Sequence, residues 1–218
     1  MNLTGTAFHP DFGEAVNYRA IPLSSDPDTQ VAQMIGHMRL AAIEDSGSEP
    51  IQRDAANLQS GSGDHCSDTF WFNKGRVGFQ RDEQTADPFA DHFDDDVVEV
   101  MIRPRDLANM RQPKEDCDGF ATYAASQLRA LGVPCNFVTI AADGREPNRY
   151  SHVYLACYPN GQRVALDISH GAYPGWEAPN MFGRKKEWPI DGPDGCELFL
   201  MAAIWAGLWF LGRWSGIL

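Results

Sequence analysis

Three residues in the second half of the chain have the types needed to act together on a carbonyl group: Cys117, His152 and Asp167. A cysteine thiolate is a strong nucleophile, an imidazole can take the thiol proton, and a carboxylate can hold that imidazole in one tautomer. Singly, each type is more often structural, and a lone helical cysteine is usually a small core residue. The case for chemistry therefore depends on the elements that position the three residues.

The stretch that begins at Cys117 is expected to be a helix. Asp116 is a favourable N-cap residue, and Gly132 supplies a stop. An apolar face repeats at helical spacing through Phe120, Ala124, Leu128 and Leu131. Cys117 then lies in the first turn, where backbone amides and the helix dipole favour a thiolate and can help to hold an oxyanion. The acidic neighbours Glu115, Asp116 and Asp118 oppose this by raising a thiol pKa unless they point away.

Three short strands are expected after the helix, with His152 opening the second and Asp167 lying in the third. Asn160-Gly161 is a hairpin signal between the second and third strands. A turn centred there puts an apolar face on one side, in the pairs Cys157 with Val164, Leu155 with Leu166, and Val153 with Ile168. His152 and Asp167 then share the other face as diagonal neighbours, within reach of each other.

These features resemble the transglutaminase-like superfamily of cysteine enzymes. The resemblance is carried by Cys117 at a helix start, by Ser151-His152-Val153-Tyr154 in one strand and by Leu166-Asp167 in the next, and it covers roughly residues 29–170. Family members often have Gly-Asp-Cys-Asp-Asp around the nucleophile, whereas this chain has Glu115 and Gly119 at the outer positions. The resemblance implies an α+β, papain-like fold with a helix-borne cysteine on an antiparallel sheet. Its members include peptidases, amidases, cross-linking acyltransferases and inactive relatives.

Other polar residues are weaker candidates for the same chemistry. Gln112, just before the cysteine, is either an oxyanion donor or a solvent-facing loop residue, and Gln84 is a second candidate. His170 is the rival of His152, which is preferred because its carboxylate partner is expected on the same face. His65 beside Cys66 only faintly suggests metal or redox chemistry. We expect no metal and no cofactor.

Composition excludes some classes of function. The chain has 218 residues and a net charge of −12, which argues against a nucleic-acid-binding surface and against attraction to anionic lipid. Its five cysteines are scattered, with no zinc-finger spacing, and a chain of this length does not need a disulfide, so a reducing compartment is expected. The N-terminus lacks the pattern of a signal peptide.

The sequence predicts three parts: an extended arm at 1–28, a cysteine-enzyme domain at 29–195 and a hydrophobic C-terminal helix at 196–218. Inside the domain, the patterns predict a helix from Pro27 to Gly47, a second capped by Ser48, helical character at 68–72, strands at 77–80 and 97–102, and a helical turn at 105–110. The acidic run at 87–96 is read as a solvated loop rather than a cation site. The Pro- and Gly-rich segment 173–194 either lines a cleft or wraps the surface.

The C-terminal segment changes character completely. Residues 198–211 contain no charged side chain, and the apolar stretch to Leu218 is just long enough to cross a bilayer. Trp205, Trp209 and Trp214 suit a membrane interface, but a buried docking helix would have the same composition. We expect a membrane-associated protein with its catalytic domain on the cytoplasmic side, or a component of a virus particle.

Two functions therefore remain open. The first is a thiol-dependent peptidase or amidase that acts on a peptide or protein amide, by analogy peptidoglycan peptides, through Cys117, His152 and Asp167. The second is a non-catalytic or cross-linking protein of the same fold, docked through residues 198–218 into a membrane or an assembly. No nucleic-acid partner is expected.

Overall fold

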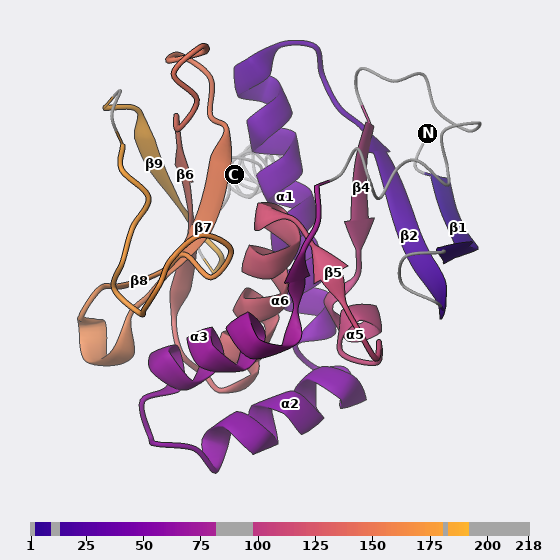
Figure 1. Ribbon diagram of the computed structural model, residues 1–218, viewed down its shortest axis with the longest axis vertical. Helices are drawn as coiled ribbons and strands as arrows, with labels where there is room; N and C mark the ends of the chain where they lie inside the picture. Colours follow the sequence, from indigo (N-terminus) through magenta and orange to yellow (C-terminus); the bar gives the residue numbers. More distant parts are fainter. Residues whose placement is uncertain (1–2, 10–13, 82–97, 181–182, 192–218) are drawn as a thin grey trace, which may run out of the picture.

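The computed structural model describes residues 3–9, 14–81, 98–180 and 183–191. Helix α6 (Cys117–Ala130) lies at the centre of the molecule, with a sheet of four strands on one side and a sheet of three strands on the other (Figure 1). Every residue from Asp118 to Leu128 is buried. Small and apolar side chains occupy most of the helix surface, and a helix of that kind is stable only when other elements surround it. Its N-terminal residue, Cys117, is therefore held by a well-packed element.

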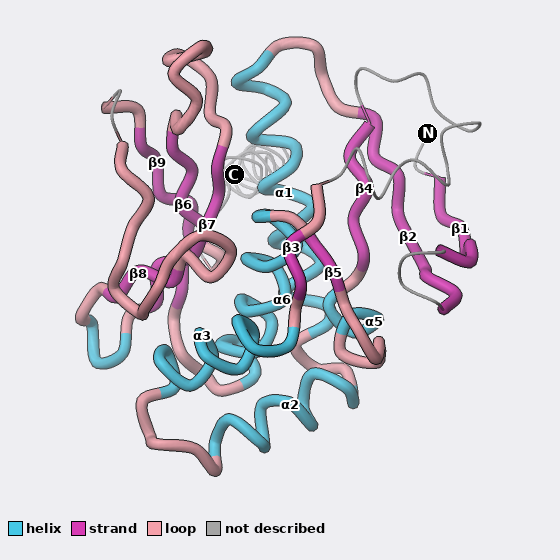
Figure 2. The backbone as a smooth tube through the Cα atoms, viewed as in Figure 1, coloured by secondary structure: helices cyan, strands magenta, loops and turns pink. Residues whose placement is uncertain are grey.

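Four further helices pack around α6 or beside it, as the tube in Figure 2 shows. They are α1 (Pro27–Asp45), α2 (Glu49–Gln59), α3 (His65–Arg76) and α5 (Pro104–Leu107). Buried polar side chains fix their positions: Tyr123 of α6 donates to Asp54 of α2 at 2.5 Å, and Asn73 of α3 donates to Gln127 of α6 at 2.6 Å. Buried hydrogen bonds of this kind oppose sliding of the helices because breaking one leaves an unsatisfied polar group.

The predicted helix starts are confirmed where capping residues mark them. Asp26 caps α1 by accepting from the Thr29 amide at 2.9 Å, and Ser48 is the N-cap residue of α2. Asp116 caps α6. The Asp26 and Asp116 carboxylates satisfy amides that the first turn of a helix leaves without an intrahelical partner, whereas the Ser48 hydroxyl donates to the Asp45 carbonyl instead.

An antiparallel sheet of four strands covers one side of α6. Its order is β8 (Val164–Leu166), β7 (His152–Cys157), β6 (Cys135–Ile140) and β9 (Lys185–Pro189). The predicted hairpin register is confirmed, because Leu155 pairs with Leu166 and Cys157 with Val164. Asn160 and Gly161, at φ 52° and 79°, make the turn. Asp167 follows the last residue of β8 rather than lying within the strand.

The two faces of this sheet are separated as the alternation predicts. Val153, Leu155 and Leu166 belong to the main core with α6, whereas Tyr154, Ala156 and Ala165 form a second cluster on the far face. With helices packed on one face of an antiparallel sheet, the fold is α+β.

Two smaller sheets were not predicted. Strands β1 (Leu3–His9) and β2 (Glu14–Pro22), from the expected arm, pair with each other, and β2 also pairs with β4 (Val98–Ile102). A parallel pair joins β3 (Gly78–Phe79) to β5 (Lys114–Glu115), directly before Cys117. Strand β9, within the Pro- and Gly-rich segment, was also missed.

The expectation that all five cysteines are reduced is wrong. A disulfide joins Cys66 of α3 to Cys157 of β7, with 6.4 Å between their Cα atoms. The two residues are 91 positions apart, so only the packing of α3 near the sheet brings them to bonding distance. Cys117 and Cys135 are outside the disulfide.

Two expectations fall outside the described residues: the acidic loop at 87–96, together with Gln84, and the C-terminal helix at 196–218. Over the ranges that the structure does describe, no helix combines the length and the apolar character that a bilayer crossing requires.

Candidate active site

Cys117 is the first residue of α6, and its acidic neighbour Asp116 faces the helix backbone. The Asp116 carboxylate accepts hydrogen bonds from the amides of Asp118 at 3.1 Å and of Gly119 at 3.5 Å. The carboxylate therefore compensates the positive end of the helix. The same bonds occupy two of the amides that the sequence offered as oxyanion donors, so these two donors are already used in the resting protein.

Glu115 and Gly119 pack against each other. A Cβ at position 119 would lie 2.4 Å from the Glu115 carboxyl carbon. Glu115 is 2% exposed, and its oxygens accept from the amides of Ile102 and Asp116, both at 3.3 Å. Glu115 thus uses the space that glycine leaves beside the first turn of α6 and ties that turn to β4.

His152 and Asp167 are in direct contact. His152 Nε2 lies 2.9 Å from Asp167 Oδ2, and the residues are 7% and 0% exposed. The other carboxylate oxygen accepts from the Ser169 hydroxyl at 3.3 Å and from the His170 backbone amide at 3.2 Å. Since Asp167 occupies Nε2, the ring nitrogen that could accept a proton from a thiol is Nδ1.

Cys117 and His152 both line one cavity of about 200 Å³. Its wall includes the apolar side chains of Leu23, Val31 and Met34, from the start of α1 and the residues before it. Arg149 also lines the cavity and bonds Gln30 at 3.4 Å. The cavity is small, and a thiol and an imidazole lie at its surface. Asp116 and Asp118 line it as well, and one carboxylate oxygen of each lies within 4.8 Å of the Cys117 sulfur, so these acidic neighbours do not point away from the thiol.

A larger hollow of about 460 Å³ lies elsewhere, beside the C-terminal end of α6. Gly47, Arg129, Pro134 and Asp191 are among the residues that line it. It contains no cysteine or histidine, so size alone is a poor guide to the chemistry of this molecule.

The structure tests one of the two predicted glutamines, Gln112, and shows another, Gln80, close to the start of α6. Gln112 is exposed in the loop before β5 and does not line the cavity of Cys117 and His152. Gln80 was not predicted from the sequence as a site residue. It is 5% exposed, and its backbone amide donates to the backbone carbonyl of Glu115 at 2.9 Å. The strand at 77–80 was expected, but its parallel pairing with residues 114–115 has no local sequence signal.

His170 lies beside the pair formed by His152 and Asp167, called the dyad below, and does not take the place of His152 as the partner of Asp167. Its ring centroid is 4.7 Å from that of His152, in an edge-to-face contact, and its Nδ1 lies 2.9 Å from the Ser169 hydroxyl. Burial lowers the pKa of His170, and the nearby His152 and Lys74 act in the same direction. Around neutral pH, its imidazole is therefore mainly uncharged.

Comparison with known proteins identifies no family for the chain. No family model matches it, and no curated protein does. Among solved structures, the chain resembles the crystal structure of a presumed cysteine protease from Cytophaga hutchinsonii, at 14% identity and a TM-score of 0.40. The alignment covers 83% of this chain and 65% of that one, just under two thirds of its length. A TM-score this low establishes neither the fold family nor the function of the chain.

Proposed function

We propose that the protein is a cysteine-dependent hydrolase of the papain-like and transglutaminase-like kind, a peptidase or amidase. The observation that carries the proposal is the buried 2.9 Å contact between His152 and Asp167, beside a cavity that Cys117 also lines. A carboxylate on one imidazole nitrogen fixes the tautomer and makes the other nitrogen a base. We predict that the Cys117 sulfur and a ring nitrogen of His152 lie within about 4 Å of each other.

In the proposed reaction, His152 Nδ1 takes the thiol proton and the Cys117 sulfur attacks the amide carbon. The carbon–sulfur bond forms as the carbonyl π electrons move to oxygen. His152 then protonates the leaving amine as the carbon–nitrogen bond breaks, which leaves a thioester on Cys117. Water activated by His152 hydrolyses that thioester and restores the thiol. The backbone amide of Cys117 is the oxyanion donor that we propose.

The cavity favours an aliphatic side chain on the acyl part of the substrate. Leu23, Val31 and Met34 offer an apolar wall, and burying a substrate side chain of Leu or Val size there is worth ~1.5–3 kcal/mol. We propose short peptides as the substrate class, with peptidoglycan peptides to be tested first. Cross-linking, in which an amine replaces water at the thioester, is the competing outcome.

Alkylation of Cys117 tests the proposal. Iodoacetamide should label Cys117 near neutral pH at least tenfold faster in the parent protein than in His152→Ala, because the imidazole raises the thiolate fraction. Removing the imidazole widens the cavity that the thiol lines, which by itself would speed labelling, so slower labelling in the variant reports the loss of the base. Cys135 is a second reference within the same sample, because burial raises the pKa of its thiol to about 12. Equal labelling rates in the two proteins would instead favour the non-catalytic reading.

We also propose that residues 198–218 attach the protein to a membrane or a larger assembly. The proposal rests on the apolar composition of that segment. Flotation of the full chain with lipid vesicles, compared with a chain ending at residue 195, tests it. Flotation that is unchanged by the truncation would contradict a role for the segment in lipid binding.

A further inference from the structure

His152 and Asp167 have a third polar neighbour that the proposed reaction does not use. One ligand atom from each of His152, Asp167 and His170 can be chosen so that all three lie within 4.8 Å of one another. The set comes from two places in the fold, the start of β7 and the turn that follows β8. Two imidazoles and one carboxylate converging in this way form a ligand set typical of divalent transition metals.

We propose that His152, Asp167 and His170 form a binding site for a divalent transition-metal ion such as Zn²⁺, and that the ion withdraws His152 from Cys117. The site itself is independent of the proposed hydrolase function, whereas the effect on Cys117 rests on it. Three protein ligands leave a coordination position for water, as in other open zinc sites.

The surroundings of the three residues suit a metal. Asp167 is held in place by the Ser169 hydroxyl and the His170 amide, so the carboxylate is already oriented. His170 Nδ1 is within hydrogen-bond distance of Ser169, which leaves Nε2 as the nitrogen for the ion. His170 is exposed, whereas His152 and Asp167 are buried, so an ion would enter from the His170 side.

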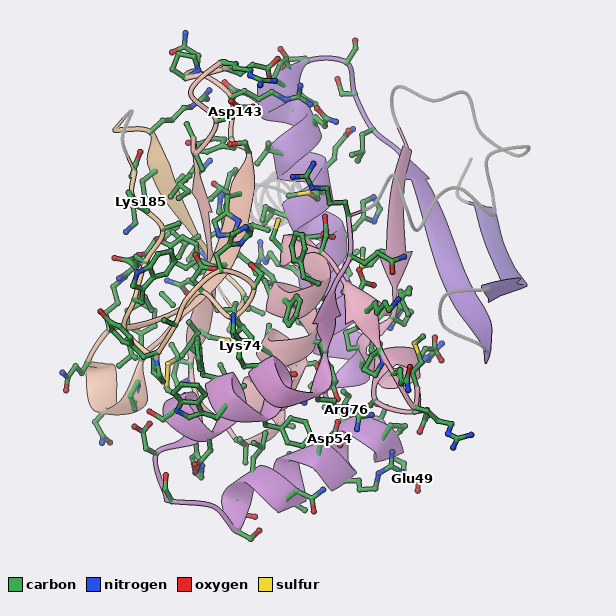
Figure 3. All side chains as sticks on the ribbon, in the orientation of Figure 1. Glu49, Asp54, Lys74, Arg76, Asp143 and Lys185 are labelled. Carbon is green, nitrogen blue, oxygen red and sulfur yellow. A yellow bond between two sulfur atoms is a disulfide. The ribbon has the colours of Figure 1, made fainter. Side chains whose placement is uncertain are left out.

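One charge opposes a cation here. Lys74 of α3 reaches the turn that carries His170, where its ammonium donates to the carbonyl oxygens of Ile168 at 2.9 Å and Ser169 at 3.3 Å (Figure 3). The Asp167 carboxylate offsets this charge. When the ion takes Nε2 of His152 from Asp167, the single proton of the neutral ring moves from Nε2 to Nδ1, so the imidazole stays uncharged.

Metal occupancy and thiol chemistry should exclude each other. In the resting dyad, Asp167 orients the His152 ring through Nε2. A metal bound to both residues takes this contact and leaves the ring proton on Nδ1, so Nδ1 can no longer accept the proton of the thiol. Zinc would then slow alkylation of Cys117 without touching the thiol.

Calorimetric titration of the full-length Cys117→Ser protein with Zn²⁺, in chelator-treated buffer, tests the site without its nearest thiol. We expect one ion per chain, and at least tenfold weaker binding after adding His170→Ala, which keeps the backbone amide that Asp167 uses. His65→Ala is the matched control and should bind as tightly as the parent, since His65 lies at the start of α3 outside the cluster. Visible bands of bound Co²⁺ provide a second readout.

Binding that is absent from Cys117→Ser, or unchanged by His170→Ala, would overturn the site. In the protein that retains Cys117, added Zn²⁺ should slow iodoacetamide labelling in the parent and not in His170→Ala. Zinc binding in Cys117→Ser together with an unreactive Cys117 in metal-free buffer would uphold the site and contradict the hydrolase function instead.

Discussion

At the scale of single residues, Asp167 is constrained on both of its carboxylate oxygens. One faces His152 Nε2 at 2.9 Å, and the other accepts from Ser169 and the His170 amide. A buried carboxylate with three partners has one orientation, and it gives the imidazole one orientation in turn. The proximity of His152 and Asp167 could be anticipated from the sequence, because the Asn160-Gly161 turn and the apolar alternation set the register. The packing of His170 beside them could not, since it depends on the loop after β8.

Removing the Asp167 carboxylate should reduce turnover strongly. We expect Asp167→Ala to lower kcat/KM by about 10²- to 10⁴-fold, because the imidazole loses the group that fixes its tautomer. Ser169→Ala is the matched control: it removes one hydrogen bond to the same carboxylate and should cost less than about tenfold. Kinetics on a peptide amide, with circular dichroism to verify folding, measure both. Turnover unaffected by Asp167→Ala would move the orienting role to another residue.

At the scale of elements, the start of α6 is fixed by side-chain packing as well as by its cap. Glu115 lies against Gly119, and its carboxylate holds the Ile102 amide of β4. Positions 115 and 119 are therefore coupled: a buried glutamate at 115 needs a residue without a side chain at 119. The contact between Glu115 and Gly119 could not be predicted from the sequence alone.

Gly119→Ala should destabilise the protein by about 1–3 kcal/mol through overpacking. The clashing Glu115 side chain is flexible, but moving it breaks its hydrogen bonds to two buried amides. Glu115→Ala combined with Gly119→Ala should cost less than the sum of the single changes, because the clash disappears. Gly36→Ala in α1 is the control; nothing lies within 4 Å of the added carbon, so it should stabilise by ~0.5–1 kcal/mol. Urea denaturation measures all four variants, and strict additivity would contradict the coupling.

The outer face of the four-stranded sheet carries a cluster of charged side chains centred on Glu177. Its carboxylate accepts from Arg163 at 2.5 Å, from Tyr154 at 2.7 Å and from Lys185 at 2.8 Å. Burial alone would raise the pKa of Glu177, but these bonds outweigh it and lower the pKa to about 2. The cluster connects β7 and β9 with Arg163, directly before β8, and with the segment after β8 that carries Glu177.

This cluster predicts an acid-dependent loss of stability. A carboxyl whose pKa is depressed on folding stabilises the protein above its unfolded pKa, here 4.5, and that contribution is lost as pH falls toward 2. Glu177→Gln should lower stability at pH 7 by about 1 kcal/mol, a small value because the group is partly exposed, and should flatten the decline below pH 4.5. Melting curves across this range test the prediction. Glu146→Gln, which removes an exposed ion pair with Arg149, should leave the profile unchanged.

At the scale of the whole molecule, the features that could be predicted from the sequence are those set by residues close together in the chain. The caps at Asp26 and Asp116 and the hairpin between β7 and β8 each depend on residues that lie close together in the chain. The parallel pairing of β3 with β5, the place of β9 beside β6 and the Cys66–Cys157 bond depend on how distant elements pack. No local pattern specifies these contacts, because a composition rich in Pro and Gly or an isolated cysteine is compatible with many partners.

The disulfide connects the helical half of the molecule to the sheet that carries His152. Cys66 and Cys157 are both fully buried, and the bond closes a loop of about ninety residues, for which chain entropy predicts ~4–5 kcal/mol of stabilisation. We expect Cys66→Ala with Cys157→Ala, or reduction of the parent by dithiothreitol, to lower the melting temperature by ten degrees or more. Cys135→Ala, a buried cysteine outside the bond, should cost only ~1 kcal/mol and controls for lost side-chain volume. Mass spectrometry of alkylated protein establishes that the bond is present before reduction and absent after it. A melting temperature that does not change when the bond is lost would mean that the packing of α3 near the sheet holds the two halves together without it.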